Sequence, residues 1–188
     1  MRLTVRPLSC LAGLVLLAAM ACHRRPSGDI APVSGPRVSD GNIVAIVLAA
    51  NNTDLSYARL VPSRARSADV KAFAQRMTTD HMILNAKVND IAMRNGITGA
   101  ENAESLDFRD RSAERRDAMR ELEGARFDST YIANEVQYHT ELLSAINALL
   151  APNARNAELR EFVGNLKPAV SAHLAHAEQV RAALVSRK

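Results

Sequence analysis

The chain has 188 residues and a net charge of +4; 47% of its residues are hydrophobic and 23% are charged, as in an ordinary globular domain. Aromatic residues make up only 4% and Trp is absent, which argues against a platform for stacking nucleic-acid bases. The 8 Gly and 7 Pro are too few for a turn-rich all-β fold. Arg and Glu are interleaved rather than separated, so we expect no nucleic-acid partner.

Residues 1–22 have the pattern of an export signal. Arg2 and Arg6 give a positively charged start, and the uncharged, mostly apolar run 8–21 follows. As a helix this run would span about 21 Å, which is short of the ~30 Å hydrocarbon core of a membrane. Ala19-Met20-Ala21 fits the small-x-small pattern that precedes a signal cleavage site. We therefore predict a signal peptide over residues 1–22.

Cys22 directly follows this pattern and resembles the cysteine of a bacterial lipobox, which becomes the first residue and carries the lipid. Ala19 stands where a lipobox usually has Leu, so the alternative is a secreted protein cleaved after Ala21. We predict lipidation of Cys22 and a lipid-anchored location on the periplasmic face of the cell envelope, with the outer membrane favoured. The only other cysteine of the sequence, Cys10, lies within the signal. We therefore expect neither a disulfide nor cysteine-ligated zinc in the rest of the chain.

Residues 23–39 contain three Pro, two Gly and three Ser, the composition of a flexible tether. The domain proper is predicted over residues 40–186, with Asp40 as the first helix cap. Apolar residues recur there at steps of three and four, which predicts long amphipathic helices. The predicted helices are 40–60, 67–95, 127–150 and 156–185, with a shorter, charged, mostly exposed helix at 105–123.

Short turns should pair these long helices into two antiparallel hairpins, and residues 97–126 are long enough to cross between them. An all-α, ferritin-like four-helix bundle with a long crossover and a short extra helix is therefore the predicted fold. Pro168 should kink the last helix. The predicted core faces of the second and third long helices are Val70, Ala74, Met77, His81, Leu84, Val88 and Ile91, and Ile132, Val136, His139, Leu143, Ile146 and Leu150.

Three stretches resemble one bacterial family: VKAFAQRMTTDH at 70–81, FDSTYI at 127–132 and LKPAVSAHLAHA at 166–177. It is a family of ferritin-like four-helix domains of unknown function, whose members are often named as outer-membrane or periplasmic proteins. The resemblance covers about residues 38–186 and implies the fold and the location, but no activity. The family usually carries Glu in its first helix where this chain has Asp54.

His81, His139 and His173 fall on the core faces of three different helices, and the first helix offers Asp54 at a similar depth. Three imidazoles and a carboxylate suit a single transition-metal ion, so these four residues are the predicted metal ligands. His176 is a possible further ligand because it follows His173 by three residues. A di-iron site is disfavoured, since no Glu-x-x-His motif is present and carboxylates are few.

The alternative is a buried network in which each histidine is neutral and hydrogen-bonded to Asp54, Asn51, Asn85, Tyr131 or Tyr138. No motif for nucleophilic catalysis or nucleotide binding is present, which argues against an enzyme. Two functions therefore stay open. One is a membrane-tethered envelope bundle that acts by binding or as structure. The other is a metal-binding, metal-storage or metal-dependent redox protein. No protein partner is indicated.

Overall fold

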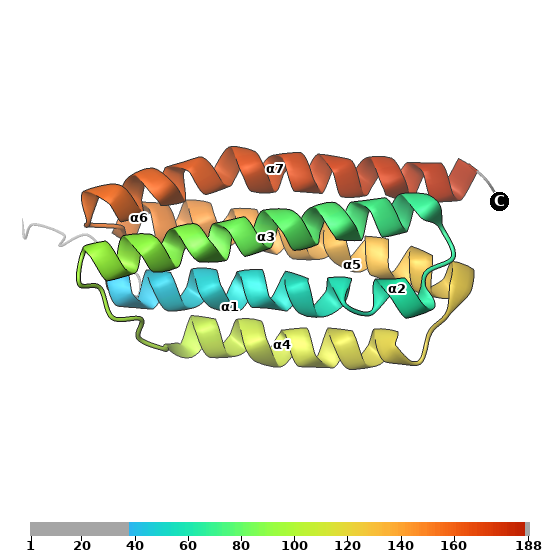
Figure 1. The fold of residues 1–188 in the computed structure, drawn as a ribbon, viewed down its shortest axis with the longest axis horizontal. Coiled ribbons are helices and arrows are strands. Elements are labelled where there is room, and N and C mark those ends of the chain that lie inside the picture. Colours follow the sequence, from blue (N-terminus) through green and yellow to red (C-terminus); the bar gives the residue numbers. More distant parts are fainter. Residues whose placement is uncertain (1–37, 187–188) are drawn as a thin grey trace, which may run out of the picture. The chain divides into compact units, whose positions relative to one another are not determined.

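The computed structural model describes residues 38–186, and all the regular secondary structure in this range is helical (Figure 1). The predicted all-α bundle is confirmed. The predicted signal peptide, Cys22 and nearly all of the tether lie outside the described residues. The elements are α1 (Asp40–Ala58), α2 (Val61–Arg64), α3 (Ala68–Arg94), α4 (Ala103–Arg120), α5 (Gly124–Ala145), a π-helical segment (Ile146–Leu150), α6 (Ala151–Asn153) and α7 (Ala157–Ser186).

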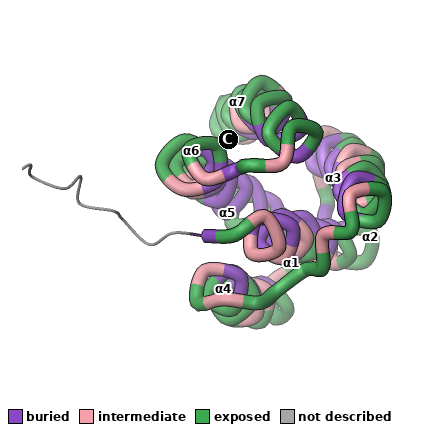
Figure 2. The backbone as a smooth tube through the Cα atoms, turned by 90° about the vertical axis from the view of Figure 1, so that its left-hand side faces the viewer, coloured by how far each residue is buried: buried purple, intermediate pink, exposed green. Residues whose placement is uncertain are grey.

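Four long helices, α1, α3, α5 and α7, surround the core with their buried positions turned inward (Figure 2). The chain runs in opposite directions along α1 and α3, and again along α5 and α7, so each pair forms a hairpin (Figure 1). Helix α4 carries the chain back along the outside of α1, so α3 and α5 run in the same direction. The two predicted hairpins and the helical crossover are therefore present.

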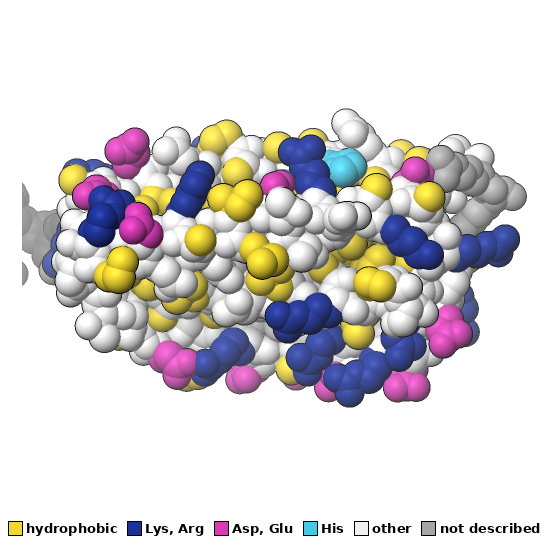
Figure 3. All heavy atoms as spheres, viewed as in Figure 1, with side chains coloured by type: hydrophobic (Ala, Val, Ile, Leu, Met, Phe, Trp, Pro, Cys, Tyr) yellow, Lys and Arg dark blue, Asp and Glu magenta, His cyan; other side chains and the backbone are white. Residues whose placement is uncertain are grey.

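Helix α1 is buried on most of its circumference because α4 packs against its outer side. Its buried residues include Val44, Val47 and Ala58, and also Ile43, Ile46 and Tyr57. Helix α4, in contrast, buries only Ser105, Phe108, Ser112 and Met119, as expected for a solvated helix. Acidic and basic side chains alternate over α4 at the lower edge of Figure 3. Their ion pairs include Arg111 with Asp107 and Arg120 with Asp117.

Two aspartates hold the ends of the bundle together. The prediction that Asp40 caps α1 was wrong, because Ser39 is the cap and accepts a hydrogen bond from the Asn42 amide. The Asp40 carboxylate instead accepts the backbone amides of Arg155 and Asn156, at 2.8 and 2.9 Å, just before α7. At the opposite end, Asp128 of α5 accepts the amides of Arg66 and Ser67 just before α3, at 3.1 and 2.9 Å.

The predicted core faces need adjustment in two helices. Val136 and Leu143 of α5 are only half-buried, because α5 is rotated to bury Glu135, Tyr138 and Leu142. The Tyr138 hydroxyl donates to the backbone oxygen of Ala50 in α1 at 2.6 Å, which fixes this rotation. In α3, Leu84 is half-buried beside a surface pocket.

The last helix, α7, continues through Pro168 without interruption. Within residues 38–186, no helix has both the length and the apolar character needed to cross a membrane.

Candidate metal centre

Four helices bring the predicted polar residues together in the middle of the bundle. The ring of His81 (α3) lies 6.0 Å from that of His139 (α5), and both rings lie 5.4 Å from that of His173 (α7). One Asp54 oxygen from α1 lies 3.2 Å from His81 Nε2 and 3.6 Å from His139 Nε2. All four residues are buried. The structure thus brings the three histidines and Asp54 together, while their role as metal ligands stays a prediction.

Glu135 belongs to the same cluster, and sequence analysis missed it as a site residue. It is fully buried one turn before His139, and its Oε2 lies 3.5 Å from His139 Nδ1. One side-chain oxygen each of Asp54 and Glu135 and one ring nitrogen of His139 lie within 4.8 Å of one another. The spacing of four residues before His139 was the available signal, because residues four apart share a helix face. The cluster thus contains two carboxylates and three imidazoles.

A chain of three asparagines sets the tautomer of His81. Asn85 donates to Asn52 at 3.0 Å, and Asn51 donates to Asn85 at 2.9 Å, so the side-chain oxygen of Asn51 faces the imidazole. His81 Nδ1 lies 2.9 Å from this oxygen and must donate to it. In the neutral imidazole, Nε2 of His81 is then the acceptor nitrogen, and it lies on the side of Asp54. The hydrogen bond predicted between a histidine and Asn51 is confirmed, whereas Asn85 bonds to Asn51 and Asn52 and to no histidine in the described residues.

The other two imidazoles are arranged in the same way. His139 Nδ1 donates to the backbone oxygen of Glu135 at 2.9 Å, which leaves Nε2 unprotonated beside Asp54. His173 Nε2 donates to the Asp80 carboxylate at 2.9 Å, which leaves Nδ1 unprotonated. Asp80 is adjacent to His81 but leaves α3 in a different direction, and its carboxylate meets α7 instead. Each imidazole therefore donates its N–H hydrogen bond to an acceptor at the edge of the cluster.

The remaining polar atoms of these five side chains are unpaired within the described residues. Within residues 38–186 they have no hydrogen-bond partner in the protein: both oxygens of Asp54 and of Glu135, Nε2 of His81 and of His139, and Nδ1 of His173. The buried hydroxyl of Tyr131 is also unpaired in this range. Buried polar atoms are almost always paired in proteins, so such a concentration of bare acceptors needs a physical explanation.

The pKa values of the two buried carboxyl groups are shifted in opposite directions. Burial alone would raise the pKa of Asp54, but the three imidazoles, His81 foremost, hold that pKa below its ordinary value. Burial and the neighbouring Asp54 carboxylate raise the pKa of Glu135 well above its ordinary value. Burial lowers the pKa of His139 to about 4 and also lowers the pKa of His173, although Asp80 opposes the latter shift. Without a bound cation, the cluster at neutral pH holds an ionised Asp54 and a neutral His139.

The donor set fits a single transition-metal ion. One nitrogen each of His81, His139 and His173 lie within 4.8 Å of one another, and Asp54 supplies an oxygen beside two of them. Nitrogen-rich sites of this kind suit zinc, copper(II) or nickel, whereas a di-iron carboxylate site needs about four carboxylates. The cluster has two, so the expectation against a di-iron site still holds.

His176 stands apart from the cluster. Its ring packs against Phe73 at 5.1 Å, and it is in neither group of close metal-ligating atoms found in the described part of the chain. The structure thus gives no support to His176 as a further ligand.

No curated protein and no solved structure matches the chain. One family model matches residues 26–180 and begins inside the predicted tether. The resemblance to a family of unknown function is thereby confirmed, whereas the ferritin-like and outer-membrane descriptions are not part of this match. The chain belongs to the family described as domain of unknown function, DUF4142.

Proposed function

We propose that the protein is a metal-binding helical bundle of the cell envelope, which holds one transition-metal dication between its four long helices. The ligands are His81 Nε2, His139 Nε2, His173 Nδ1 and an oxygen of Asp54, and Glu135 lies beside them. One observation carries the proposal: ligand nitrogens of His81, His139 and His173 lie within 4.8 Å of one another in a buried space beside Asp54, whose two oxygens have no hydrogen-bond partner among the described residues.

A purely hydrogen-bonded network explains this arrangement poorly. In such a network the imidazole protons would point at Asp54, but His81, His139 and His173 donate outward, to Asn51, Glu135 and Asp80 respectively. An ionised carboxylate left unpaired in a protein interior is strongly unfavourable. A cation at the centre removes this penalty. The outward hydrogen bonds then act as they do in known metal sites, where they fix the tautomer and orientation of each ligand.

The ligand chemistry selects the class of metal. Three imidazoles and one carboxylate favour zinc, copper(II) or nickel over calcium and magnesium, which prefer oxygen ligands. A bound ion of this class would supply Lewis acidity or, for copper, redox chemistry at this position. The protein's part is to orient the three rings, exclude water and hold the negative charge of Asp54. Metal binding or storage is the function that these residues support best, and we propose no reaction.

The connectivity supports a ferritin-like fold. One long crossover between two antiparallel hairpins, with α3 and α5 running in the same direction, is the connectivity of ferritin-like bundles. Such folds carry many functions, so the proposal rests on the ligand cluster rather than on the topology.

Attachment to the membrane is the second part of the proposal and rests on the sequence. The signal pattern of residues 1–22, the cysteine that follows Ala21 and the tether composition of 23–39 support a lipid on Cys22. The acyl mass on the mature N-terminus and membrane fractionation test this part. A Cys22→Ala variant should be exported but released from the membrane. A wild-type N-terminus without acyl mass would contradict the anchor and leave the metal proposal untouched.

Metal titration of the chelator-stripped protein tests the central part. We expect one zinc, cobalt(II) or copper(II) ion per chain and, with cobalt, a visible spectrum typical of nitrogen ligation. The triple change of His81, His139 and His173 to Ala should abolish stoichiometric binding. His176→Ala is the matched control and should bind like the wild type, because His176 lies outside the cluster. Equal binding by the triple variant and the wild type, or none by the wild type, would refute the proposal.

A thermal melt with and without chelator separates the metal site from a hydrogen-bonded network. At a free-metal concentration about 100 times Kd, the ion should stabilise the wild type by about 2.7 kcal/mol, and chelator should remove this gain. The triple variant should melt at one temperature in both conditions. A network would instead make the wild type equally stable with and without chelator.

A further inference from the structure

We infer that the metal ion enters and leaves through a pocket between α3 and α7, with Asp80 as its first contact and the His173 ring as the gate. This inference rests on the proposed metal centre. The pocket measures about 250 Å³. Its walls are formed by Arg76, Asp80, Ile83, Leu84, Ala169, Ala172 and His173.

His173 connects this pocket to the centre. The side chains of Asp54, His81 and His139 have no solvent-accessible surface, whereas the His173 side chain keeps 4% of its surface accessible and forms part of the pocket wall. The Nε2 atom of His173 is hydrogen-bonded to Asp80, its Nδ1 atom is buried without a hydrogen-bond partner in the described residues, and one of its nitrogens lies within 4.8 Å of those of His81 and His139. The ring therefore separates solvent from the ligand atoms, and rotation of this one side chain would open the way.

Asp80 is suited to receive an incoming cation. Its side chain is 32% accessible, and its carboxylate lies 2.9 Å from His173 Nε2 and 3.4 Å from Arg76 Nε. A partly exposed carboxylate at the mouth of a pocket raises the local concentration of cations. Asp80 accepts a hydrogen bond from His173, and an ion bound by Asp80 would take the place of this donor. The hydrogen bond that holds the His173 ring would therefore break as the ion arrives. Arg76 competes with the ion for the same oxygen atom.

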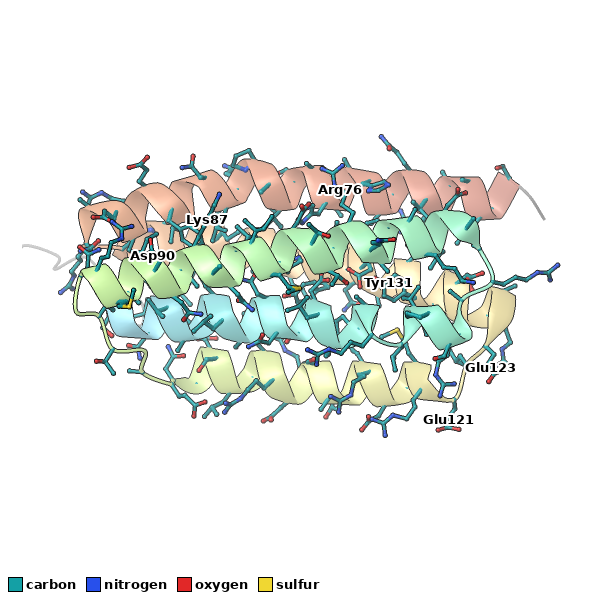
Figure 4. The ribbon with its side chains drawn as sticks, viewed as in Figure 1. Arg76, Lys87, Asp90, Glu121, Glu123 and Tyr131 are labelled. Atoms are coloured by element: carbon teal, nitrogen blue, oxygen red, sulfur yellow. The ribbon has the colours of Figure 1, made fainter. Side chains whose placement is uncertain are left out.

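The surroundings of the pocket favour access on this side. A second pocket of about 400 Å³ adjoins it, shares Leu84 and Ala169 with it, and continues along the α3–α7 face. In Figure 4, Arg76 and Lys87 lie along the edge of α3 that borders α7, whereas Tyr131 lies in the interior behind α3. Helix α4 covers the outer side of α1, the helix that carries Asp54. The α3–α7 face is therefore the short way from solvent to the cluster.

A bulky side chain at the pocket mouth tests the route. Ala172→Phe places a ring over the pocket, and Ala175→Phe adds the same ring on the exposed surface of α7 outside it. In stopped-flow loading of the full, chelator-stripped protein with cobalt(II) or zinc, we expect Ala172→Phe to load about tenfold more slowly, as when binding waits for a conformational change. Release to an excess of chelator should slow equally, so Kd stays unchanged. Ala175→Phe should load like the wild type.

Each outcome decides between the two proposals. If the wild type binds metal and both variants load at its rate, the route through this pocket is wrong and the metal centre stands. If the wild type binds no metal, both proposals fail. If Ala172→Phe loses helicity, Ala169→Phe replaces it, because Ala169 lines the same pocket and is half-buried.

The role of Asp80 has its own test. Asp80→Asn keeps a hydrogen-bond acceptor for His173 but removes the charge. It should slow loading at low ionic strength, and this difference should shrink as salt screens the attraction. Asp107→Asn, on α4 and paired with Arg111, lies away from both pockets; it is the matched control and should load like the wild type. Equal loading rates for Asp80→Asn and the wild type at low salt would refute the role of Asp80.

Discussion

The ends of the bundle and its middle bury different kinds of side chain. Toward the α2 end, Phe127 stacks on Tyr131 with ring centroids 5.8 Å apart, and Phe73 meets Tyr131 edge-on at 6.2 Å. Toward the α6 end, Ile43, Leu150 and Leu159 are fully buried. Aspartates join the helices at both ends through backbone amides. In the middle, five titratable side chains meet with their inward atoms unpaired in the described chain.

The two kinds of layer differ in what they contribute to stability. Packed apolar layers and satisfied hydrogen bonds stabilise the ends. Each unpaired buried polar group in the middle costs about 1–3 kcal/mol. Sequences depart from consistent packing mainly at functional sites, so the middle layer is where we expect a ligand to bind.

The largest effect should come from the apolar end. Phe127 is fully buried in the first turn of α5, so Phe127→Ala should destabilise the fold by about 3–5 kcal/mol through lost burial and a cavity. Urea denaturation measures this loss, which should be the same with and without metal, because Phe127 is not a member of the ligand cluster. Leu106→Ala, at an exposed position on α4, should change stability by no more than about 0.5 kcal/mol. Similar losses in both variants would contradict the contrast.

The next effect belongs to the middle and changes affinity rather than folding. Asn51→Ala removes the acceptor that holds the His81 proton on Nδ1, so the metal should bind about 10–100 times more weakly. Metal titration and the ¹⁵N chemical shifts of the His81 ring check the affinity and the tautomer. Asn52→Ala, at the exposed end of the same chain of amides, should leave both close to wild type. An unchanged affinity for Asn51→Ala would show that the asparagine chain does not position His81.

The pH dependence of the free energy of unfolding of the metal-free protein is a further test of the middle layer. His139 has a pKa of about 4 in the folded state against about 6.5 unfolded, so its contribution to stability is lost as pH falls through this window. Glu135 acts oppositely: its pKa is raised in the folded state, so its contribution is lost as pH rises above its unfolded value of about 4.5. The two contributions oppose each other between about pH 4.5 and 6.5.

Glu135→Gln removes one side of this balance. The free energy of unfolding of the variant should rise with pH more steeply than that of the wild type. The difference should be about 1.4 kcal/mol per pH unit, because the titration of one carboxyl group is removed, and the variant should be the more stable protein at pH 7. Urea denaturation across pH 4.5–7 measures both. Glu141→Gln is the control: burial would raise the pKa of Glu141, but Arg115 and Gln137 hold it below its ordinary value, so its effect falls below about pH 4.5 and its profile should parallel that of the wild type across pH 4.5–7. Parallel pH profiles for Glu135→Gln and the wild type would contradict an effect of Glu135.

The part of the site that follows helical periodicity could be predicted from the sequence. His81, His139 and His173 continue apolar faces at steps of three and four, and a residue on such a face must point into the bundle. Glu135 was harder to place, because the face through Ile132 and Val136 puts it at the edge. Its burial depends on the rotation of α5, which is fixed by the contact of Tyr138 with α1.

The contacts between distant segments could not be predicted from periodicity. Asp80 and His173 are 93 residues apart, and their pairing depends on how α3 and α7 are rotated about their own axes. Asp40 was expected to cap its own helix, but its partners, the Arg155 and Asn156 amides, are 115 and 116 residues away. Sequence rules for helix capping pair such a residue with a backbone donor a few positions away in the chain. In the folded bundle, donors from distant segments lie within hydrogen-bond distance and take its place.

The smallest effect should come from the ion pairs of α4. Arg115 is 22% accessible and lies 2.7 Å from Glu141 of α5, so it connects α4 to the bundle. Arg120 is 51% accessible and pairs only within α4, with Asp117, among the ion pairs of the described residues. Arg115→Ala should destabilise the fold by about 1 kcal/mol or less, and Arg120→Ala by still less, because exposed pairs contribute little.

Both losses of stability should fall with added salt, because salt screens the ion pairs, whereas the loss in Phe127→Ala should not. Denaturation in low and high salt makes this comparison. A salt-independent loss in Arg115→Ala would mean that the packing of its aliphatic stem, rather than its charge, holds α4 against the bundle.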